Sequence, residues 1–324
     1  GSLPNAPVIR TAPRSCPYIR AVTPAYRNAL LLLHFTVFLW GWTGIFGKLI
    51  QQETAQLVFT RTFIALAGLT VFALATRRSL DWRTPDLKNY FFMGLLIVLH
   101  WLSFYGSIKV STASIGAACM ATSTMFTALM EPFWFKRRIR PYEVVLGVVV
   151  IGALLLMFGL ETKYRLGIAL GVVSAWLSAW FNIVNGVLVR RGDPVRIGFY
   201  ELLFVMLCAA AWVSANGEIP RLPWTLSVDD LKYQLLLGLV CTTFAFVTGI
   251  AVMKQLSPFT VVLAVNLEPV YTIAIALLIW GEGERMHTGS YAGIAIILFC
   301  LFANGWLQRR ERQKQEATTI APIV

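Results

Sequence analysis

The chain has 324 residues, of which 57% are hydrophobic and 14% are charged, and its mean hydropathy is +0.67. Soluble globular proteins carry roughly 25% charged residues, so this composition excludes a soluble protein, whose surface needs more charges. The net charge of +12 does not indicate a nucleic-acid-binding protein, because the Lys and Arg residues lie between long apolar runs and not along one helix face.

The apolar runs have the length of membrane-spanning helices, which need about 20 mostly apolar residues. Ten stretches meet this requirement, and most of the connections between them are short. They are 29–50, 56–76, 90–108, 112–135, 141–160, 166–189, 197–215, 233–253, 257–280 and 289–307. The sequence therefore predicts an all-α membrane protein with ten transmembrane helices.

The distribution of cations predicts the orientation of these helices. Twenty of the 28 Lys and Arg residues lie on the side of the membrane that holds both termini, seven lie on the other side, and Arg61 lies within a span. Cytoplasmic loops carry the excess of Lys and Arg. We therefore expect a multi-pass protein of the plasma (inner) membrane with both termini cytoplasmic, including a disordered tail at 1–27 and a tail at 309–324.

The two halves of the chain resemble each other. In each half, three residues on corresponding helices follow one another at the same intervals of 13 and 11 residues. The residues that show them are Ser123, Lys136 and Gly147 in the first half, and Pro269, Glu282 and Gly293 in the second. The predicted repeats are 28–160 and 161–308, and each contains five helices. Since five is odd, the second repeat enters the membrane from the opposite face, and inverted repeats of this kind place the substrate site near the bilayer midplane.

Several short motifs connect the chain to a known family. They are Leu39-Trp40-Gly41, Lys48, Arg61, Leu267-Glu268-Pro269, Leu278-Ile279-Trp280-Gly281-Glu282 and Gly293. With them the chain resembles the drug/metabolite transporter superfamily, specifically its EamA branch, over nearly all of 29–307. The resemblance implies ten helices, alternating access, and export of amino acids or other small metabolites. The first half departs from the family pattern at Ser123 and Lys136, where Pro and Glu are expected.

Glu268 is the first candidate for a substrate site, because an ionisable group at the centre of a span costs at least about 2.5–3.5 kcal/mol. It lies between Asn266 and Pro269, near the middle of the ninth predicted helix. Pro269 has no N–H and frees the carbonyl of Val265. We expect a carboxylate that faces a cavity and, with Asn266, binds a substrate amine or a coupling cation. The alternative is a structural carboxylate bonded to a neighbouring helix.

Arg61 and Glu201 are candidate gating charges. The repeat makes them equivalent positions with opposite charge, Arg61 near the outer end of the second helix and Glu201 near the inner end of the seventh. Each charge could pair in only one conformation of the transporter. The alternative is that each side chain snorkels to the nearer interface.

Aromatic and polar residues within the spans are further candidates for substrate contacts. They are Trp40, His100, Trp101, Tyr105, Trp176, Trp180, Asn182 and Tyr271. A few such groups that converge in a cavity could stack on a substrate or face a cation. The alternative is that some of them belong to the aromatic belts at the membrane interfaces.

The sequence contains no nucleotide, phosphate-loop or metal motif, so we expect no cofactor. These features favour a secondary transporter over an ATP-driven pump or an enzyme. Its expected partners are a small-molecule substrate and the lipid bilayer, with the proton as a candidate coupling ion and no nucleic acid. The alternative is a membrane-embedded enzyme that acts on a lipid, which would need clustered His, Asp or Glu residues, whereas the three His residues are scattered.

Overall fold

The computed structural model describes residues 24–84, 86–135, 140–189, 191–252, 255–256, 261 and 264–320. Within these ranges the chain is helical and contains no strand. The main helices are α1 (Pro24–Leu49), α2 (Thr54–Ala75), α3 (Leu87–Val110), α4 (Ala113–Met120), α5 (Ser123–Phe135), α6 (Pro141–Leu160), α7 (Arg165–Leu188), α8 (Pro194–Ala215), α9 (Val228–Leu235), the π-helix η3 (Leu236–Phe244), α10 (Ala245–Val252), α12 (Glu268–Trp280) and α13 (Thr288–Ile320).

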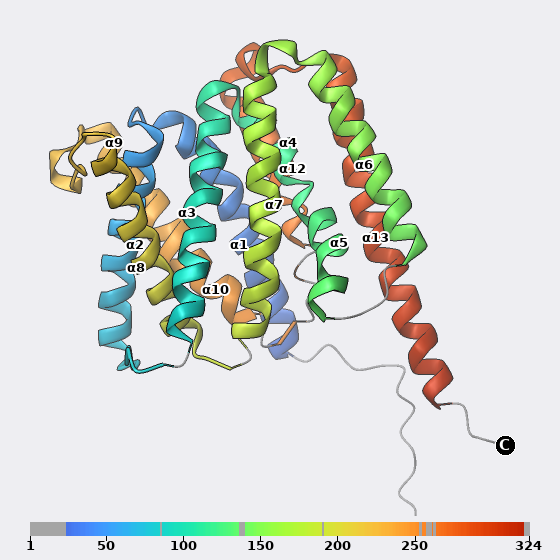
Figure 1. Cartoon of the computed structure of the whole chain (residues 1–324), viewed down its shortest axis with the longest axis horizontal. Coiled ribbons are helices and arrows are strands. Elements are labelled where there is room, and N and C mark those ends of the chain that lie inside the picture. Colours follow the sequence, from blue (N-terminus) through green and yellow to red (C-terminus); the bar gives the residue numbers. More distant parts are fainter. Residues whose placement is uncertain are drawn as a thin grey trace, which may run out of the picture.

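The helices cross between two opposite faces of the molecule (Figure 1). We call the face at which α1 begins and α13 ends the lower face, and the opposite one the upper face. Successive spans alternate in direction, so that α1 rises from the lower face whereas α7 descends from the upper face. The first helices of the two halves therefore run in opposite directions, as five spans in each half require.

Nine of the ten predicted spans are found as helices that are long and apolar enough to cross a membrane. The tenth, 257–280, lies partly outside the described residues, and its described part includes α12. The predicted tail at 1–27 overlaps the first helix, because α1 begins at Pro24, and residues 1–23 lie outside the description. The last helix extends beyond its predicted span to Ile320, into the predicted tail at 309–324.

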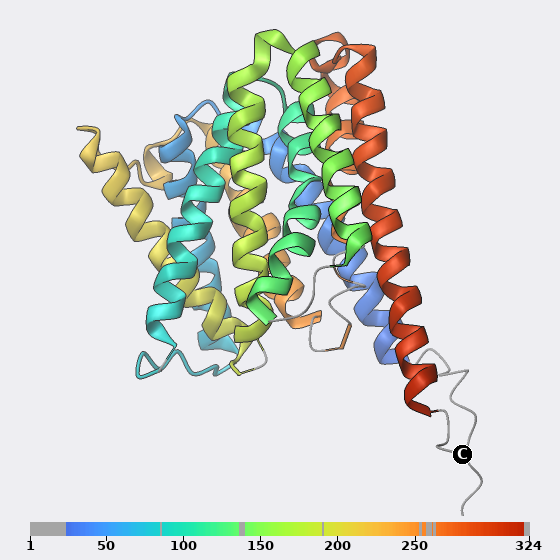
Figure 2. The ribbon, with the colours of Figure 1, turned by 45° about the vertical axis from the view of Figure 1, so that its right-hand side comes forward.

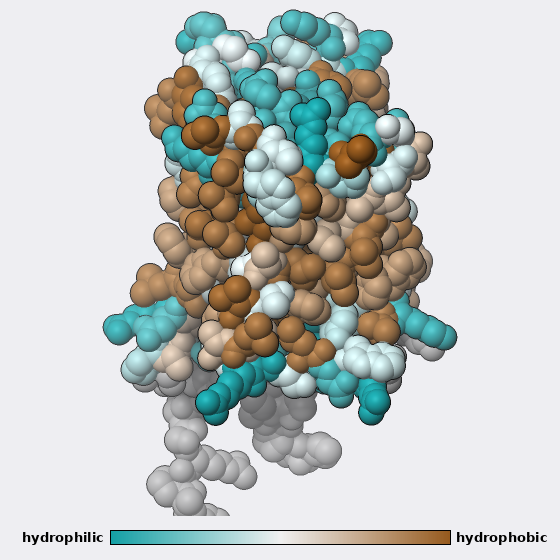
Figure 3. Space-filling model, turned by 90° about the vertical axis from the view of Figure 1, so that its left-hand side faces the viewer, coloured by the Kyte–Doolittle hydropathy of each residue, from teal (hydrophilic) through white to brown (hydrophobic). Residues whose placement is uncertain are grey.

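An apolar belt crosses the side of the bundle that Figure 3 shows, and exposed apolar side chains also lie on α6. Figure 3 shows hydrophobic residues across the middle of one side of the molecule and hydrophilic residues above and below them. The helix α6 contributes large exposed apolar side chains, among them Val145, Val148 and Leu155, which are between 61% and 65% exposed. Side chains of this kind are stable in contact with lipid tails, so their exposure fits a helix at the edge of a membrane protein. The helices α6 and α13 lie side by side at this edge (Figures 1 and 2).

Small residues set the closest helix contacts. A Cβ atom added to Gly167 would lie 2.5 Å from Cβ of Ser111, and one added to Gly171 would lie 2.7 Å from Cβ of Cys119. These two glycines are four residues apart and let α7 approach the segment around α4. Their spacing therefore serves helix packing.

The π-helix η3 brings the eighth span against α2. Its hydroxyl groups bond to carbonyl oxygens five residues earlier, Thr242 to Leu237 O at 2.7 Å and Thr243 to Gly238 O at 3.1 Å. A Cβ atom added to Gly238 would lie 3.1 Å from the carbonyl oxygen of Arg61. Because π-helical turns widen a helix, they redirect the side chains that follow, and here Thr242 points at Arg61.

Candidate functional site

Both halves of the molecule contain a broken helix at corresponding positions. The fourth predicted helix is split at Ala121 and Thr122 into α4 and α5, and the ninth has a turn at Asn266 and Leu267 before α12 begins. When Ser123 is aligned with Pro269, the two breaks fall within one residue of each other. Broken helices at membrane depth are tolerated where they are covered by protein or line a water-filled cavity.

A hydrogen bond connects the two broken helices. The hydroxyl of Thr124, in the first turn of α5, donates to Oδ1 of Asn266 at 2.6 Å. Asn266 is 3% exposed, so this contact is internal. The two breaks therefore meet inside the bundle.

Arg61 lies at the centre of a cluster formed by three elements. Its Nε donates to Oγ1 of Thr242 in η3 at 2.7 Å, and its Nη1 donates to the hydroxyl of Tyr105 in α3. The guanidinium carbon lies 3.9 Å from the ring centroid of Trp101, within the range of a cation–π interaction. Arg61 is 4% exposed, so the guanidinium does not snorkel to an interface in this conformation.

Glu268 is the acidic side chain that interacts electrostatically with Arg61 in the part of the chain that the structure describes. It is the first residue of α12, where the N-terminal end of the helix dipole favours a negative charge. Its side chain keeps part of its surface accessible, whereas Asn266 and Pro269 on either side are buried. A cation and a carboxylate that interact electrostatically thus lie at the broken helix, and Glu268 as a residue is partly exposed.

His100 is buried beside this cluster and bonded to α7. Its Nδ1 lies 2.7 Å from Oγ of Ser174 and 3.0 Å from the carbonyl oxygen of the same residue. The imidazole ring packs against Phe104 and Phe181, with centroid separations of 6.3 and 5.3 Å. These contacts hold His100 between α3 and α7, about one and a half turns of α3 from Tyr105, which bonds to Arg61.

Trp40 and Tyr271 lie at the contacts of α1. A Cβ atom added to Gly249 in α10 would lie 2.7 Å from the Trp40 ring, and one added to Gly41 would lie 2.7 Å from Cβ of Tyr271 in α12. The Tyr271 ring also meets Phe38 edge to face, with a centroid separation of 5.6 Å. Both side chains are partly exposed, and their contacts join α1 to the second half of the molecule.

Trp176, Trp180 and Asn182 are not brought to the Arg61 cluster by these contacts. At 100° per residue, Trp176 and Trp180 lie on the face of α7 opposite to Ser174, which contacts His100. The two indole rings meet each other at 6.2 Å, and Trp180 also meets Trp134 of α5 at 5.9 Å. Trp176 is 45% exposed. Asn182 is also exposed, and it donates to Ser178 one turn earlier.

Glu201 forms a separate polar site nearer the lower face. It is fully buried in α8, and Nδ2 of Asn185 in α7 donates to its Oε2 at 3.3 Å. Arg61 and Glu201, which the repeat relates, are therefore both internal, each with partners from other helices. Asn185 was not among the candidate residues predicted from the sequence. Its polar amide within an apolar span is the signal that could have identified it.

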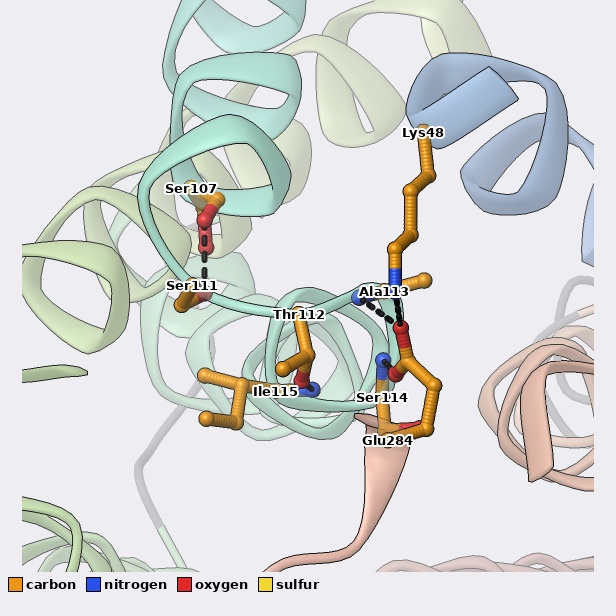
Figure 4. Close-up of polar contacts among 8 residues, drawn as sticks. All are labelled: Lys48, Ser107, Ser111, Thr112, Ala113, Ser114, Ile115 and Glu284. Carbon is orange, nitrogen blue, oxygen red and sulfur yellow. Dashed lines mark hydrogen bonds and ion pairs between the residues drawn. The ribbon is translucent and has the colours of Figure 1, made fainter. Parts of the chain in front are cut away.

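The upper face contains an ion pair that joins the two halves (Figure 4). Nζ of Lys48, at the end of α1, lies 2.6 Å from Oε1 of Glu284, which follows α12. The same carboxylate accepts hydrogen bonds from the backbone N–H groups of Ala113 and Ser114, at 3.2 and 2.8 Å. Glu284 is fully buried and caps the first turn of α4. The sequence marked Lys48 as part of a family motif but gave no sign of its partner.

The bundle, with nine candidate membrane spans in the described part of the chain, its two halves and the polar groups within it define a membrane transport protein. The model of the EamA-like transporter family matches residues 27–159 and 165–305, once for each half. The chain belongs to the EamA-like transporter family, and it is an integral, multi-pass membrane transporter of the drug/metabolite superfamily. This confirms the family and the fold class that the sequence predicted.

A solved structure supports the same fold. Its title is "Crystal structure of protein", and it aligns with 87% of this chain and 99% of its own chain at a TM-score of 0.62 and 17% identity. At this identity the likeness concerns the fold alone. No curated protein sequence matches the chain.

Proposed function

We propose that this chain is a secondary exporter of small metabolites, with amino acids as the leading class, and that it works by alternating access between two inverted repeats. The observation that carries the proposal is the cluster of Arg61, Trp101, Tyr105 and Glu268 beside the broken helices. A lipid-modifying enzyme is not proposed, since the chain belongs to a family of transporters.

The cluster has the chemistry that an amino acid requires. The two hydrogen bonds described for Arg61 use two of its five N–H donors, which leaves donors for a substrate carboxylate. Glu268, which is partly exposed, could accept hydrogen bonds from the substrate ammonium group. The Trp101 ring lies beside the Arg61 guanidinium and offers an apolar surface. A zwitterion would neutralise both charges of the site, which reduces the cost of keeping them within the membrane.

The proposed orientation places the lower face in the cytoplasm of a cell whose plasma (inner) membrane holds the protein. The excess of Lys and Arg on the side of the termini supports it. In this orientation the substrate reaches the Arg61 cluster from the lower face and leaves at the upper face, where Lys48 and Glu284 join the two halves. Movement of the substrate past this ion pair would require the upper ends of α1 and α12 to separate.

The test is transport by the full chain in proteoliposomes, with a panel of radiolabelled L-amino acids measured by counterflow and by accumulation. We expect uptake of a subset of the panel that saturates with concentration and is absent from liposomes without protein. Arg61→Lys should reduce uptake, whereas Arg83→Lys, an exposed Arg beside Trp82, should not. Failure of every amino acid, together with transport of another metabolite class, would overturn the proposed substrate class.

A further inference from the structure

Glu201 carries an inference that goes beyond the Arg61 cluster. It is the eighth residue of α8, about 10 Å along the helix axis from Pro194, and is fully buried. Its Oε2 accepts the hydrogen bond from Asn185, while its Oε1 has no hydrogen-bond partner among the described residues. Oδ1 of Asn185 is also buried and without a partner in the same part of the chain. The pair therefore contains two acceptor atoms that lack a donor.

None of the described titratable groups on the elements around α8 forms a hydrogen bond or an ion pair with Glu201. On α2, Arg61 bonds to Tyr105 and Thr242, and on α3, His100 bonds to Ser174. On α8 itself, Arg196 and Tyr200 precede Glu201, and Tyr200 stacks on Tyr90 of α3 and donates to the carbonyl of Leu80. The helix α10 contains no titratable residue, and α7 presents Asn185. No described cation faces the Glu201 carboxyl.

An ionised Glu201 would be costly in this environment. Removal of an ion from water costs several kcal/mol, and one hydrogen bond of 3.3 Å offsets little of that cost. A proton on Oε1 removes the charge and supplies the donor that the pair with Asn185 lacks. The neutral acid is therefore the form that fits the conformation seen here. This distinguishes Glu201 from Glu268, which has the charge of Arg61 nearby.

We propose that Glu201 is a proton-binding site that couples transport to the transmembrane proton gradient, an inference that rests on the proposed function. In the conformation seen here the carboxyl holds its proton, sealed by α3, α7 and α8. The close contact of α3 makes this seal, since a Cβ atom added to Gly94 would lie 3.2 Å from the carbonyl oxygen of Glu201. Separation of these helices in the other conformation admits water, which accepts the proton and leaves a hydrated carboxylate.

The proton itself can be observed without a substrate. Infrared difference spectra of the reconstituted full chain, recorded as the buffer changes from acidic to alkaline, report the C=O stretch of a buried carboxylic acid. We expect the wild type to show this band and to lose it in alkaline buffer. Glu201→Gln should lack the band, and Glu201→Asp should retain it at a shifted frequency. The exposed Glu282→Gln should match the wild type. An unchanged band in Glu201→Gln would overturn the proposal.

Transport gives the second readout. In proteoliposomes with an imposed pH gradient, accumulation of the transported amino acid by the wild type should depend on the gradient, and accumulation by Glu201→Gln should not. Wild-type transport that is indifferent to the gradient would contradict coupling through Glu201. If the wild type transports no amino acid, the proposed substrate class fails instead. The infrared titration still decides whether Glu201 binds the proton.

Discussion

The sequence places Arg61 well inside a span, and its partners explain how it is kept there. Thr242 and Tyr105 accept its hydrogen bonds, and Trp101 covers one face of the guanidinium. These contacts suit the planar fork of Arg, because the guanidinium presents its donors at fixed angles in the plane and stacks its face on a ring, whereas the Lys ammonium is compact and has no planar face. The role of Arg61 is therefore testable by a change that keeps its charge.

Arg61→Lys is expected to weaken substrate binding by about 10- to 100-fold, since hydrogen bonds to charged groups contribute roughly 1.5–3 kcal/mol. The measurement is the KM for uptake in proteoliposomes, at equal amounts of folded protein. Arg83→Lys, in the exposed segment between α2 and α3, is the matched control. An Arg61→Lys variant with wild-type KM would show that Arg61 does not contact the substrate.

Glu268→Gln removes a charge and keeps the shape of the side chain. We expect it to weaken substrate binding, or to remove the pH dependence of that binding, while the fold is retained, because the ammonium group of the substrate loses its counter-charge. Binding is measured as the rise in the unfolding temperature with added substrate. A variant that is mainly less stable and binds normally would instead identify Glu268 as a structural carboxylate.

At the scale of the helices, the polar contacts determine how the two halves are joined. Glu284 alone contacts the end of α1 and the start of α4 from a segment of the second half. Because one buried carboxylate provides the ion pair and the helix cap together, its removal affects several elements. Glu282, two residues earlier, is 77% exposed in its side chain and pairs with Arg285, so it offers a local control.

Glu284→Gln should lower the stability of the protein. Breaking a buried ion pair costs about 3–5 kcal/mol, and the loss of a helix cap about 0.5–2 kcal/mol, although the Gln amide retains one acceptor. We expect a lower unfolding temperature in detergent for Glu284→Gln and almost no change for Glu282→Gln. Equal unfolding temperatures for both variants would contradict the structural role of Glu284.

The contact between η3 and α2 can be tested through a glycine. A Cβ atom added to Gly238 would lie 2.7 Å from Cγ2 of Ile64 and 3.1 Å from the carbonyl oxygen of Arg61, so α2 must shift. We expect Gly238→Ala to cost about 1–3 kcal/mol of stability and to reduce transport by displacing Arg61. Gly186→Ala, within α7 and with nothing within 4 Å of the new atom, should be neutral or stabilising. Equal stability and transport in the two variants would show that η3 does not position Arg61.

At the scale of the whole molecule, the orientation in the membrane remains a prediction from the loop charges. Asn216, after α8, is exposed at the upper face, and Arg83 is exposed at the lower face. Cys at position 216 should react with an impermeant thiol reagent in intact cells, and Cys at position 83 only after permeabilisation. Labelling of the chain without the added Cys is measured as the control. The reverse pattern would show that the orientation is opposite to the one proposed. Glu161 is unsuitable for labelling, because it is buried and bonds to Ser290.

The sequence by itself determined the number and length of the spans, the two halves, the family and the choice of Arg61, Glu201 and Glu268 as unusual charges. These features depend on local runs of apolar residues, on counts of loop cations and on spacing along the chain. Only the tertiary structure decided the partners of those charges. Thr242 reaches Arg61 through a π-helix, and Asn185 reaches Glu201 from another helix.

The contacts of the aromatic residues were likewise decided only by the tertiary structure. Trp101 and Trp180 are equally apolar and equally placed within spans, yet Trp101 covers Arg61 whereas Trp180 lies among Trp134 and Trp176. The rotation of a transmembrane helix about its axis follows from its packing against neighbours, and spans that are apolar on all sides carry little periodicity to reveal it. Sequence alone therefore located the candidate residues along the membrane normal, while helix packing decided which of them meet.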